Sequence, residues 1–128
     1  MIAFHDMALN DQEPIYLQIL RFVKQGIAAG LVTDGDELPS RRMLSTLLGV
    51  NPNTVQKAYS ILEEEGLIVS RMGAKSCIVL HEEQYQKVRK DLVKEVSAKT
   101  VAEFTKLGFN LEETLAQIRE VWETEDEE

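Results

Sequence analysis

The sequence has few of the features that mark a secreted or membrane-bound protein. Cys77 is its single cysteine, so an internal disulfide is excluded and the chain fits a reducing cytoplasm. No apolar run approaches the roughly 20 residues that span a bilayer. Residues 1–11 lack a basic segment followed by an apolar core, so we expect neither a membrane association nor a signal peptide.

Motifs for catalysis and metal binding are also missing. His5 and His81 stand apart, without cysteines or carboxylates at metal-ligand spacing, so we expect ordinary surface histidines and no metal. There is no phosphate-binding loop, no HExxH motif and no arrangement that supports a catalytic triad. We therefore expect no cofactor and no enzymatic activity.

Positive charge is scarce, with 14 Lys and Arg against 22 Asp and Glu and a formal net charge of −8. Taken alone, this argues against a nucleic-acid partner. The distribution is uneven, however, because residues 39–80 carry five basic and three acidic side chains, whereas residues 81–128 carry seven basic and thirteen acidic ones. The small positive excess predicts few phosphate contacts per subunit, strong salt dependence and a need for dimeric binding.

Two short helices joined by a tight turn are predicted within residues 38–68. Ser40 is a good N-cap for the first helix, and Gly49 can adopt the left-handed conformation that ends it. Asn51 and Pro52 are suited to cap and begin the second. Each helix has one apolar face, formed by Leu44, Leu47 and Leu48 in the first and by Val55, Ala58, Tyr59 and Leu62 in the second. This is the helix-turn-helix pattern.

The opposite face of the second helix is polar. Its side chains can bond to phosphates or base edges, and they are Asn53, Thr54, Gln56, Lys57 and Ser60. A solvated surface helix would look the same. The next part of the chain favours DNA, because two short apolar segments, residues 67–70 and 76–80, flank a turn and predict a β-hairpin, or wing. Arg71 and Lys75 lie on either side of its tip.

An earlier helix is expected to complete a three-helix core. It runs from Pro14 to Gly30 and carries an apolar stripe of Ile15, Ile19, Phe22, Val23 and Ile27. Gly26 lies inside this helix, where it lowers helix stability and permits close packing. Residues 2–5 fit either a short strand or a disordered arm.

Several motifs occur together in one order and spacing: PIYLQI at 14–19, LPSRR at 38–42, GVNPNTVQKAY at 49–59, LEEEGLI at 62–68 and a wing glycine. They resemble the winged-helix domain of GntR-family bacterial transcription regulators. The resemblance is strong over residues 12–80. PIYLQI and the short tail resemble the small YtrA-like branch of that family.

The resemblance implies DNA contacts from the arginine of the PS-x-R motif, the turn, the recognition helix and the wing glycine, whose backbone approaches the minor groove. With their polar and basic neighbours, the implied contact residues are Ser40, Arg41, Arg42, Asn51, Asn53, Thr54, Gln56, Lys57, Arg71, Gly73 and Lys75. The wing departs from the family pattern, because residues 73–76 are Gly-Ala-Lys-Ser where Gly-Lys-Gly-Thr is frequent.

Residues 81–128 predict two amphipathic helices separated near Gly108, the second opened by a capping box of Asn110 and Glu113. Their apolar stripes consist of Tyr85, Val88, Leu92, Val96, Phe104, Leu111, Leu115, Ile118 and Trp122. A two-helix hairpin cannot bury such stripes alone, so it packs on its own winged-helix domain or on a second copy. We favour the second copy, because a two-fold dimer offers recognition helices to successive major grooves; the resemblance implies the same.

The predicted fold is mostly α with a small β wing. A winged helix-turn-helix DNA-binding domain, residues 1–80, precedes a two-helix dimerisation hairpin, residues 81–128. The predicted function is a cytoplasmic homodimeric regulator, most simply a repressor, that binds a palindromic double-stranded DNA operator. The resemblance implies transport-related target genes. The alternative is a winged-helix module for protein–protein interaction without specific DNA binding.

A small-molecule effector is left open by the sequence. The tail is too short to enclose a pocket within one chain. A site between subunits would be lined by Tyr85, Phe104 or Trp122, which fit a dimer core better.

Overall fold

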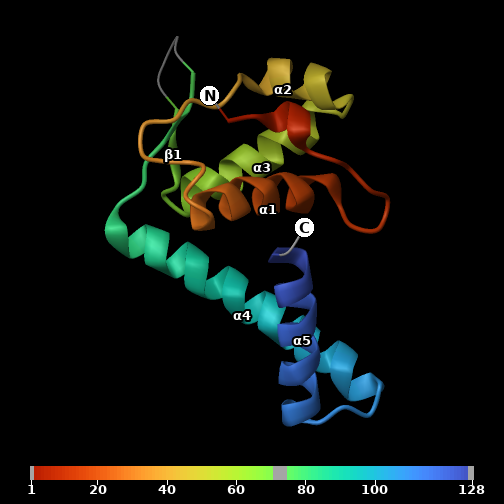
Figure 1. The fold of residues 1–128 in the computed structure, drawn as a ribbon. Coiled ribbons are helices and arrows are strands. Elements are labelled where there is room, and N and C mark those ends of the chain that lie inside the picture. Colours follow the sequence, from red (N-terminus) through yellow and green to blue (C-terminus); the bar gives the residue numbers. More distant parts are fainter. Residues whose placement is uncertain (1, 71–74, 127–128) are drawn as a thin grey trace. The chain divides into compact units, whose positions relative to one another are not determined.

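The computed structural model describes residues 2–70 and 75–126 (Figure 1). These residues form a mostly helical fold with a small antiparallel sheet, as predicted. In chain order the elements are a 3₁₀ helix η1 (Phe4–Asp6), α1 (Ile15–Ala28), α2 (Arg41–Leu48), α3 (Pro52–Glu64), β1 (Ile68–Val69), β2 (Cys77–Ile78), α4 (Glu82–Lys106) and α5 (Leu111–Asp126). None of the described helices combines the length and apolarity needed to cross a bilayer.

The chain divides into two compact units, one ending at Leu92 and one beginning at Val93. The expected boundary after residue 80 lies earlier, because the first turns of α4 belong to the first unit. Val88 is only 8% exposed and is part of that unit's core. Gln84 adds a polar link, since its side-chain amide donates to the carbonyl of Gly66 at 2.9 Å, just beyond the end of α3.

The core of the first unit lies between α1, α2 and α3, with α3 packed against both of the others (Figure 1). Its fully buried side chains include Ile19, Val23, Ile27, Leu38, Leu44, Val55, Tyr59, Leu62 and Ile78. The predicted apolar stripes of α1 and α3 are confirmed. Leu47 is the exception on α2: it is 52% exposed, because this short helix turns only one side to the core and Leu44 and Leu48 occupy it.

The N-terminal segment is part of this core. The amide of Ile2 donates to the carbonyl of Glu37 at 3.1 Å, and the η1 turn then directs Phe4 inward. Phe4 is 1% exposed, and its ring centroid lies 5.4 Å from that of Phe22. The segment is therefore neither a regular strand nor a free arm, the two options that the sequence leaves open.

The helix-turn-helix has the predicted ends. The Ser40 hydroxyl accepts from the amide of Met43 at 3.1 Å and so caps α2, which closes at Gly49 with φ 67°. The Asn51 side chain accepts from the amide of Asn53 at 2.8 Å, and Pro52 is the first residue of α3. Each cap satisfies a backbone donor that the helix itself leaves unpaired.

The sheet is shorter than predicted. Its register pairs Ile68 with Ile78 and Val69 with Cys77, and Glu37 forms an isolated bridge to Cys77. Only the inward side chains, Ile68 and Ile78, are buried, because one face of this hairpin covers the core while the other faces water.

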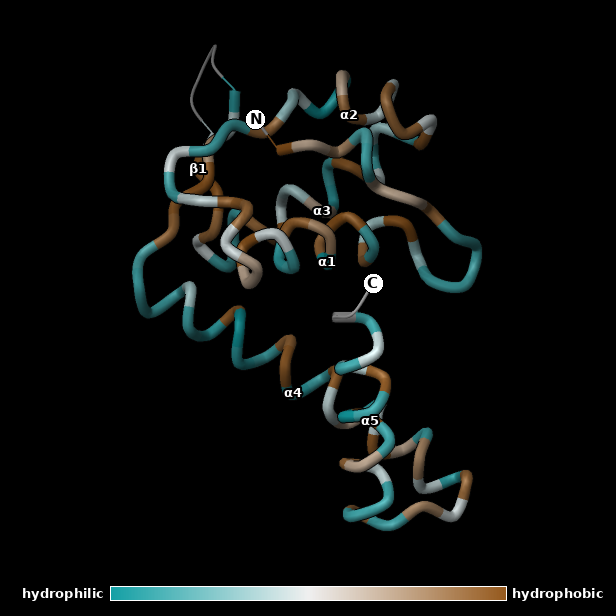
Figure 2. The backbone as a smooth tube through the Cα atoms, in the orientation of Figure 1, coloured by the Kyte–Doolittle hydropathy of each residue, from teal (hydrophilic) through white to brown (hydrophobic). Residues whose placement is uncertain are grey.

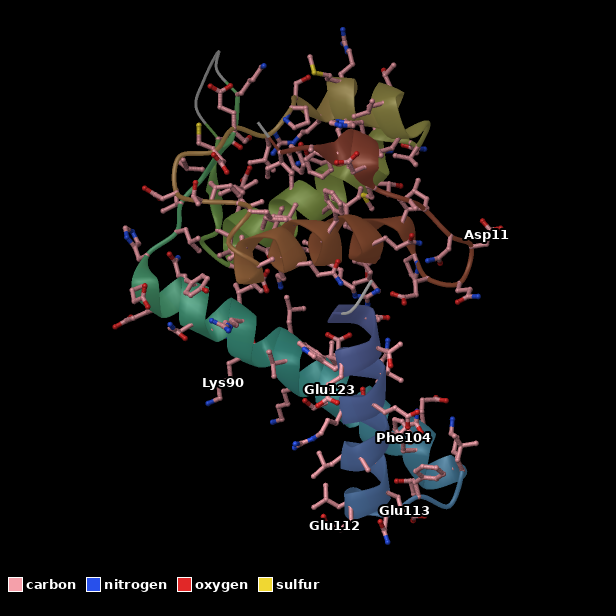
Figure 3. The ribbon with its side chains drawn as sticks, in the orientation of Figure 1. Asp11, Lys90, Phe104, Glu112, Glu113 and Glu123 are labelled. Atoms are coloured by element: carbon pink, nitrogen blue, oxygen red, sulfur yellow. The ribbon has the colours of Figure 1, made fainter. Side chains whose placement is uncertain are left out.

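The second unit contains the part of α4 from Val93 onward and the whole of α5. The predicted capping box is present: Asn110 and Glu113 exchange backbone-to-side-chain hydrogen bonds of 2.9 and 3.1 Å. Hydrophobic and hydrophilic residues alternate along α4 and α5 (Figure 2). Acidic side chains lie in the first turn of α5, at Glu112 and Glu113, and again at Glu123 near its far end (Figure 3).

Candidate nucleic-acid interface

The polar face of α3 lies at the surface of the first unit. Asn53, Gln56 and Lys57 are exposed, while Thr54 and Ser60 are partly buried. The buried side of the same helix holds α3 against α1 and α2. The recognition-helix residues predicted from sequence are therefore presented together, and Gln56 already donates to Ser60 at 3.1 Å.

Two neighbouring arginines at the start of α2 have different surroundings. Arg42 is exposed and has no hydrogen-bond or ion-pair partner within the described residues. Arg41 donates to the Glu63 carboxylate at 2.8 Å, and its guanidinium carbon lies 5.1 Å from the centroid of the Tyr59 ring. Arg42 is thus available to a phosphate, whereas Arg41 is engaged within the protein.

Tyr59 anchors this corner of the molecule. Its hydroxyl donates to the carbonyl of Pro39 at 2.7 Å, in the segment that leads into α2. Burial raises the pKa of this hydroxyl far above its ordinary value, so it keeps its proton and remains a donor.

The side chain of Lys57 packs on the ring of Tyr16, a contact that no pattern in the sequence indicates. Its ammonium nitrogen lies 4.0 Å from the centroid of Tyr16, the second residue of α1. This cation–π contact aligns the lysine on the surface of α3. The tyrosine is part of the PIYLQI motif, but the apolar stripe of α1 places it only beside the core face.

Ser40 and Asn51 belong to the predicted DNA contacts, and both are occupied as helix caps. The caps use only their acceptor oxygens. The hydroxyl hydrogen of Ser40 and the amide hydrogens of Asn51 are still able to donate to a phosphate.

The predicted wing contacts fall partly outside the described residues, which exclude Arg71 and Gly73. Lys75 is described and exposed. Its ammonium nitrogen lies 4.0 Å from a carboxylate oxygen of Glu37, a long and solvent-accessible ion pair that a phosphate can replace.

The predicted dimerisation residues separate into two groups. Val88 is buried in the first unit's own core, with Tyr85 and Leu92 packed half-buried against it, which corrects the expectation that Val88 faces a second copy. The others lie in the second unit. Phe104 is half-buried with its ring 5.6 Å from that of Phe109, whereas Val96, Leu111, Leu115, Ile118 and Trp122 are exposed.

No group of three or more His, Cys, Asp or Glu side chains that could hold a metal ion occurs among residues 2–70 and 75–126. The described surface has two other features: a polar and basic face on α2 and α3, and an exposed apolar face on the second unit.

Comparison with known proteins places these features in a family. Residues 15–77 match the family model for bacterial regulatory proteins of the gntR family. The HTH-type transcriptional regulator YhcF of Bacillus subtilis is 32% identical over 114 residues, which cover 89% of this chain and 94% of that protein. The chain belongs to the GntR family. The predicted winged helix-turn-helix is the DNA-binding fold of this family, and it corresponds here to α2, α3 and the hairpin.

Two further matches locate this GntR-family chain within the family. The HTH-type transcriptional repressor YtrA of Bacillus subtilis is 48% identical over 60 residues, which cover 47% of this chain and 46% of that repressor. A GntR-family transcriptional regulator from Listeria monocytogenes has 33% identity and a TM-score of 0.78, covering 88% of this chain and 98% of its own. The chain is a transcriptional regulator of the YtrA-like branch, and its relatives have a non-enzymatic function.

Proposed function

We propose that this GntR-family regulator binds operator DNA with α3 in the major groove. The observation that carries the proposal is the exposed polar face of α3, formed by Asn53, Gln56 and Lys57. Arg42 adds an exposed cation at the start of α2, which packs against α3, and it has no partner within the described chain. In a helix-turn-helix the second helix enters the major groove, so its polar side chains can reach base edges while a basic side chain such as Arg42 binds a phosphate.

The face contains two kinds of contact. Arg42 is cationic and long, so it binds a phosphate and gives affinity that falls with salt. Lys57 can add a second such contact after leaving the Tyr16 ring. Gln56 can pair with an adenine through two hydrogen bonds, after giving up its bond to Ser60. Sequence preference should therefore depend more on Gln56 than on either cation.

The second part of the proposal is a homodimer formed by residues from 93 onward. Support comes from the apolar side chains that α5 leaves in solvent: Leu111, Leu115, Ile118, Val121 and Trp122. A matching stripe on a second copy would cover them, and two-fold symmetry would then require a palindromic operator with half-sites about 34 Å apart.

Repression is the simplest regulatory outcome, because a bound dimer occupies promoter DNA. The curated relative YtrA is named a repressor, which supports this choice. Transport-related target genes, which the family resemblance implies, form the most specific part of the proposal. Mapping of chromosomal fragments bound by the protein tests it.

The first test is selection of bound sequences from a random duplex pool at two salt concentrations. We expect enrichment of a palindrome with half-sites one helical turn apart. Salt-sensitive background without enrichment would refute sequence-specific binding and would favour a protein partner instead.

Single substitutions then test the assignment of contacts. Arg42→Ala should lower the slope of log affinity against log salt by about one, while Gln56→Ala should broaden the selected sequence at one position. Lys90→Ala is the matched control, because Lys90 is an exposed lysine of α4 in the same unit (Figure 3). An equal effect of Lys90→Ala would remove Arg42 from the interface.

The dimer is tested in the full chain by sedimentation. Leu115→Glu places a charge in the exposed apolar stripe and should yield monomers, with Gln25→Glu at an exposed position of the first unit as the control for one added negative charge. A dimer that survives Leu115→Glu would contradict the assigned interface.

A further inference from the structure

A continuous chain of polar contacts connects the elements proposed to meet DNA. One carboxylate oxygen of Glu63, near the end of α3, accepts from Arg41 at 2.8 Å and also from the hydroxyl of Ser70, which follows β1. The Ser70 hydroxyl lies 3.0 Å from that of Ser76, which precedes β2 and is buried.

The chain of contacts closes on itself. The carbonyl of Ser76 accepts from the amide of Leu38 at 2.9 Å. Leu38 leads through Pro39, which accepts from Tyr59, and Ser40 back to Arg41. The resulting ring joins the start of α2, the end of α3 and both strands of the hairpin. We call its side chains Arg41, Glu63, Ser70 and Ser76 the Arg41–Glu63 network.

Glu63 is an unexpected residue on a helix that meets DNA, because a carboxylate repels phosphate. The hydrogen bond from Ser70 lowers the pKa of Glu63 below its ordinary value, assisted by Arg41, so the group is ionised at neutral pH. The Nε atom of Arg41 is buried and has no hydrogen-bond partner within the described chain. The ion pair with Glu63 and the contact with the Tyr59 ring nevertheless constrain the guanidinium, so Arg41 is poorly placed to turn toward a phosphate.

We propose that Arg41 and Glu63 are positioning residues, whose ion pair holds the base of the wing and the amino end of α2 in fixed relation to α3. This inference rests on the proposed DNA-binding function and deepens it. Arg41 then contributes to operator recognition by orienting Arg42 and the wing, and makes no phosphate contact of its own.

The direction in which DNA affinity changes when Glu63 is removed distinguishes this inference from simple electrostatic repulsion. If Glu63 only repelled phosphate, its removal would strengthen DNA binding. As a positioning residue, its removal weakens operator binding, by about tenfold for Glu63→Ala, since both charge-assisted hydrogen bonds are lost. Glu64 provides the matched control: it is the next residue of α3, is exposed and has no partner among the described residues. Glu64→Ala should not weaken binding.

The experiment uses the full chain with its selected operator duplex and a scrambled duplex, titrated over salt. Arg41→Ala and Glu63→Ala should each lose operator affinity, and the loss should be larger for Glu63→Ala because this change also removes the bond to Ser70. The double variant should lose less than the two single losses together, because both single changes break the Arg41–Glu63 ion pair. The salt slope should be unchanged by Arg41→Ala and lowered by Arg42→Ala. A lowered slope for Arg41→Ala, or tighter operator binding by Glu63→Ala, would overturn the inference.

A second measurement needs no DNA and keeps the inference separable from the proposed function. Amide hydrogen exchange over residues 76–79 should be faster in Glu63→Ala than in Glu64→Ala. Glu63→Gln and Ser70→Ala, which preserve more of the local packing, replace Glu63→Ala if it fails to fold. Equal exchange in all variants would refute the network, whereas faster exchange without any selected DNA sequence would refute only the proposed function.

Discussion

Gly26, in the last turn of α1, gives a prediction in which one contact decides whether alanine stabilises or destabilises the protein. In an exposed helix interior, replacing glycine by alanine stabilises by about 1 kcal/mol. At Gly26 the added methyl group would lie 2.6 Å from the Cγ2 atom of Val32, closer than real carbon atoms approach. Glycine is therefore needed where the chain folds back on α1.

Val32 has little freedom to move away. It is 5% exposed, and its β-branched side chain is restricted at χ1. The carbonyl of Gly26 also accepts from the amides of Leu31 and Val32, at 2.9 and 3.0 Å, which holds this turn against the helix. Overpacking of this kind costs about 1–3 kcal/mol, so Gly26→Ala should be destabilising by about 1 kcal/mol net.

Thermal unfolding followed by circular dichroism measures the effect, and the midpoint should fall by about 4–8 °C. Gln25→Ala, at an exposed position of the same helix, controls for helix propensity. Adding Val32→Ala removes the clashing methyl group, so the double variant should lose less stability than the two single changes together. Gly26→Ala with a higher midpoint than the unsubstituted protein would refute the reasoning.

Three further perturbations each act on a side-chain hydrogen bond. Tyr59→Phe should cost about 1–3 kcal/mol in urea unfolding, because the carbonyl of Pro39 loses its buried donor; an unchanged midpoint would mean that water replaces the hydroxyl. The unsubstituted protein should have a larger free energy of unfolding than Glu63→Gln at pH values above the ordinary carboxyl pKa of 4.5. This difference should shrink as the pH falls through the lower pKa that Glu63 has in the folded protein; a difference that grows in acid would contradict the lowered pKa. Asn110→Ala should speed amide exchange in the first turn of α5 by removing its cap, and equal exchange would show that the cap contributes nothing.

The helix ends are predictable because their causes are local. Ser40, Gly49 and the Asn51–Pro52 pair determine the turn between α2 and α3 within a few residues of chain. The family resemblance then supplies the order of the elements, and the structure has them in that order.

Contacts between distant segments are not predictable in the same way. Phe4 is buried because the chain returns to Phe22, and Arg41 is engaged because Glu63 comes to it from another helix. No periodicity within either segment contains that information. For the same reason an apolar stripe in α4 could not reveal that Val88 packs on the first unit while Val96 lies in solvent.

The burial of Val88 and the bond from Gln84 to Gly66 also define the smallest piece of this protein that could be transplanted. A chimeric regulator that joins a foreign dimerisation module after residue 80 would strip side chains from the core and loosen the end of α3. A junction after Leu92 keeps the first three turns of α4, which remain packed on the core of the first unit and bonded to Gly66, just beyond the end of α3. Whole turns of helix inserted beyond that junction would then become a practical means of tuning the operator spacing that an engineered repressor accepts.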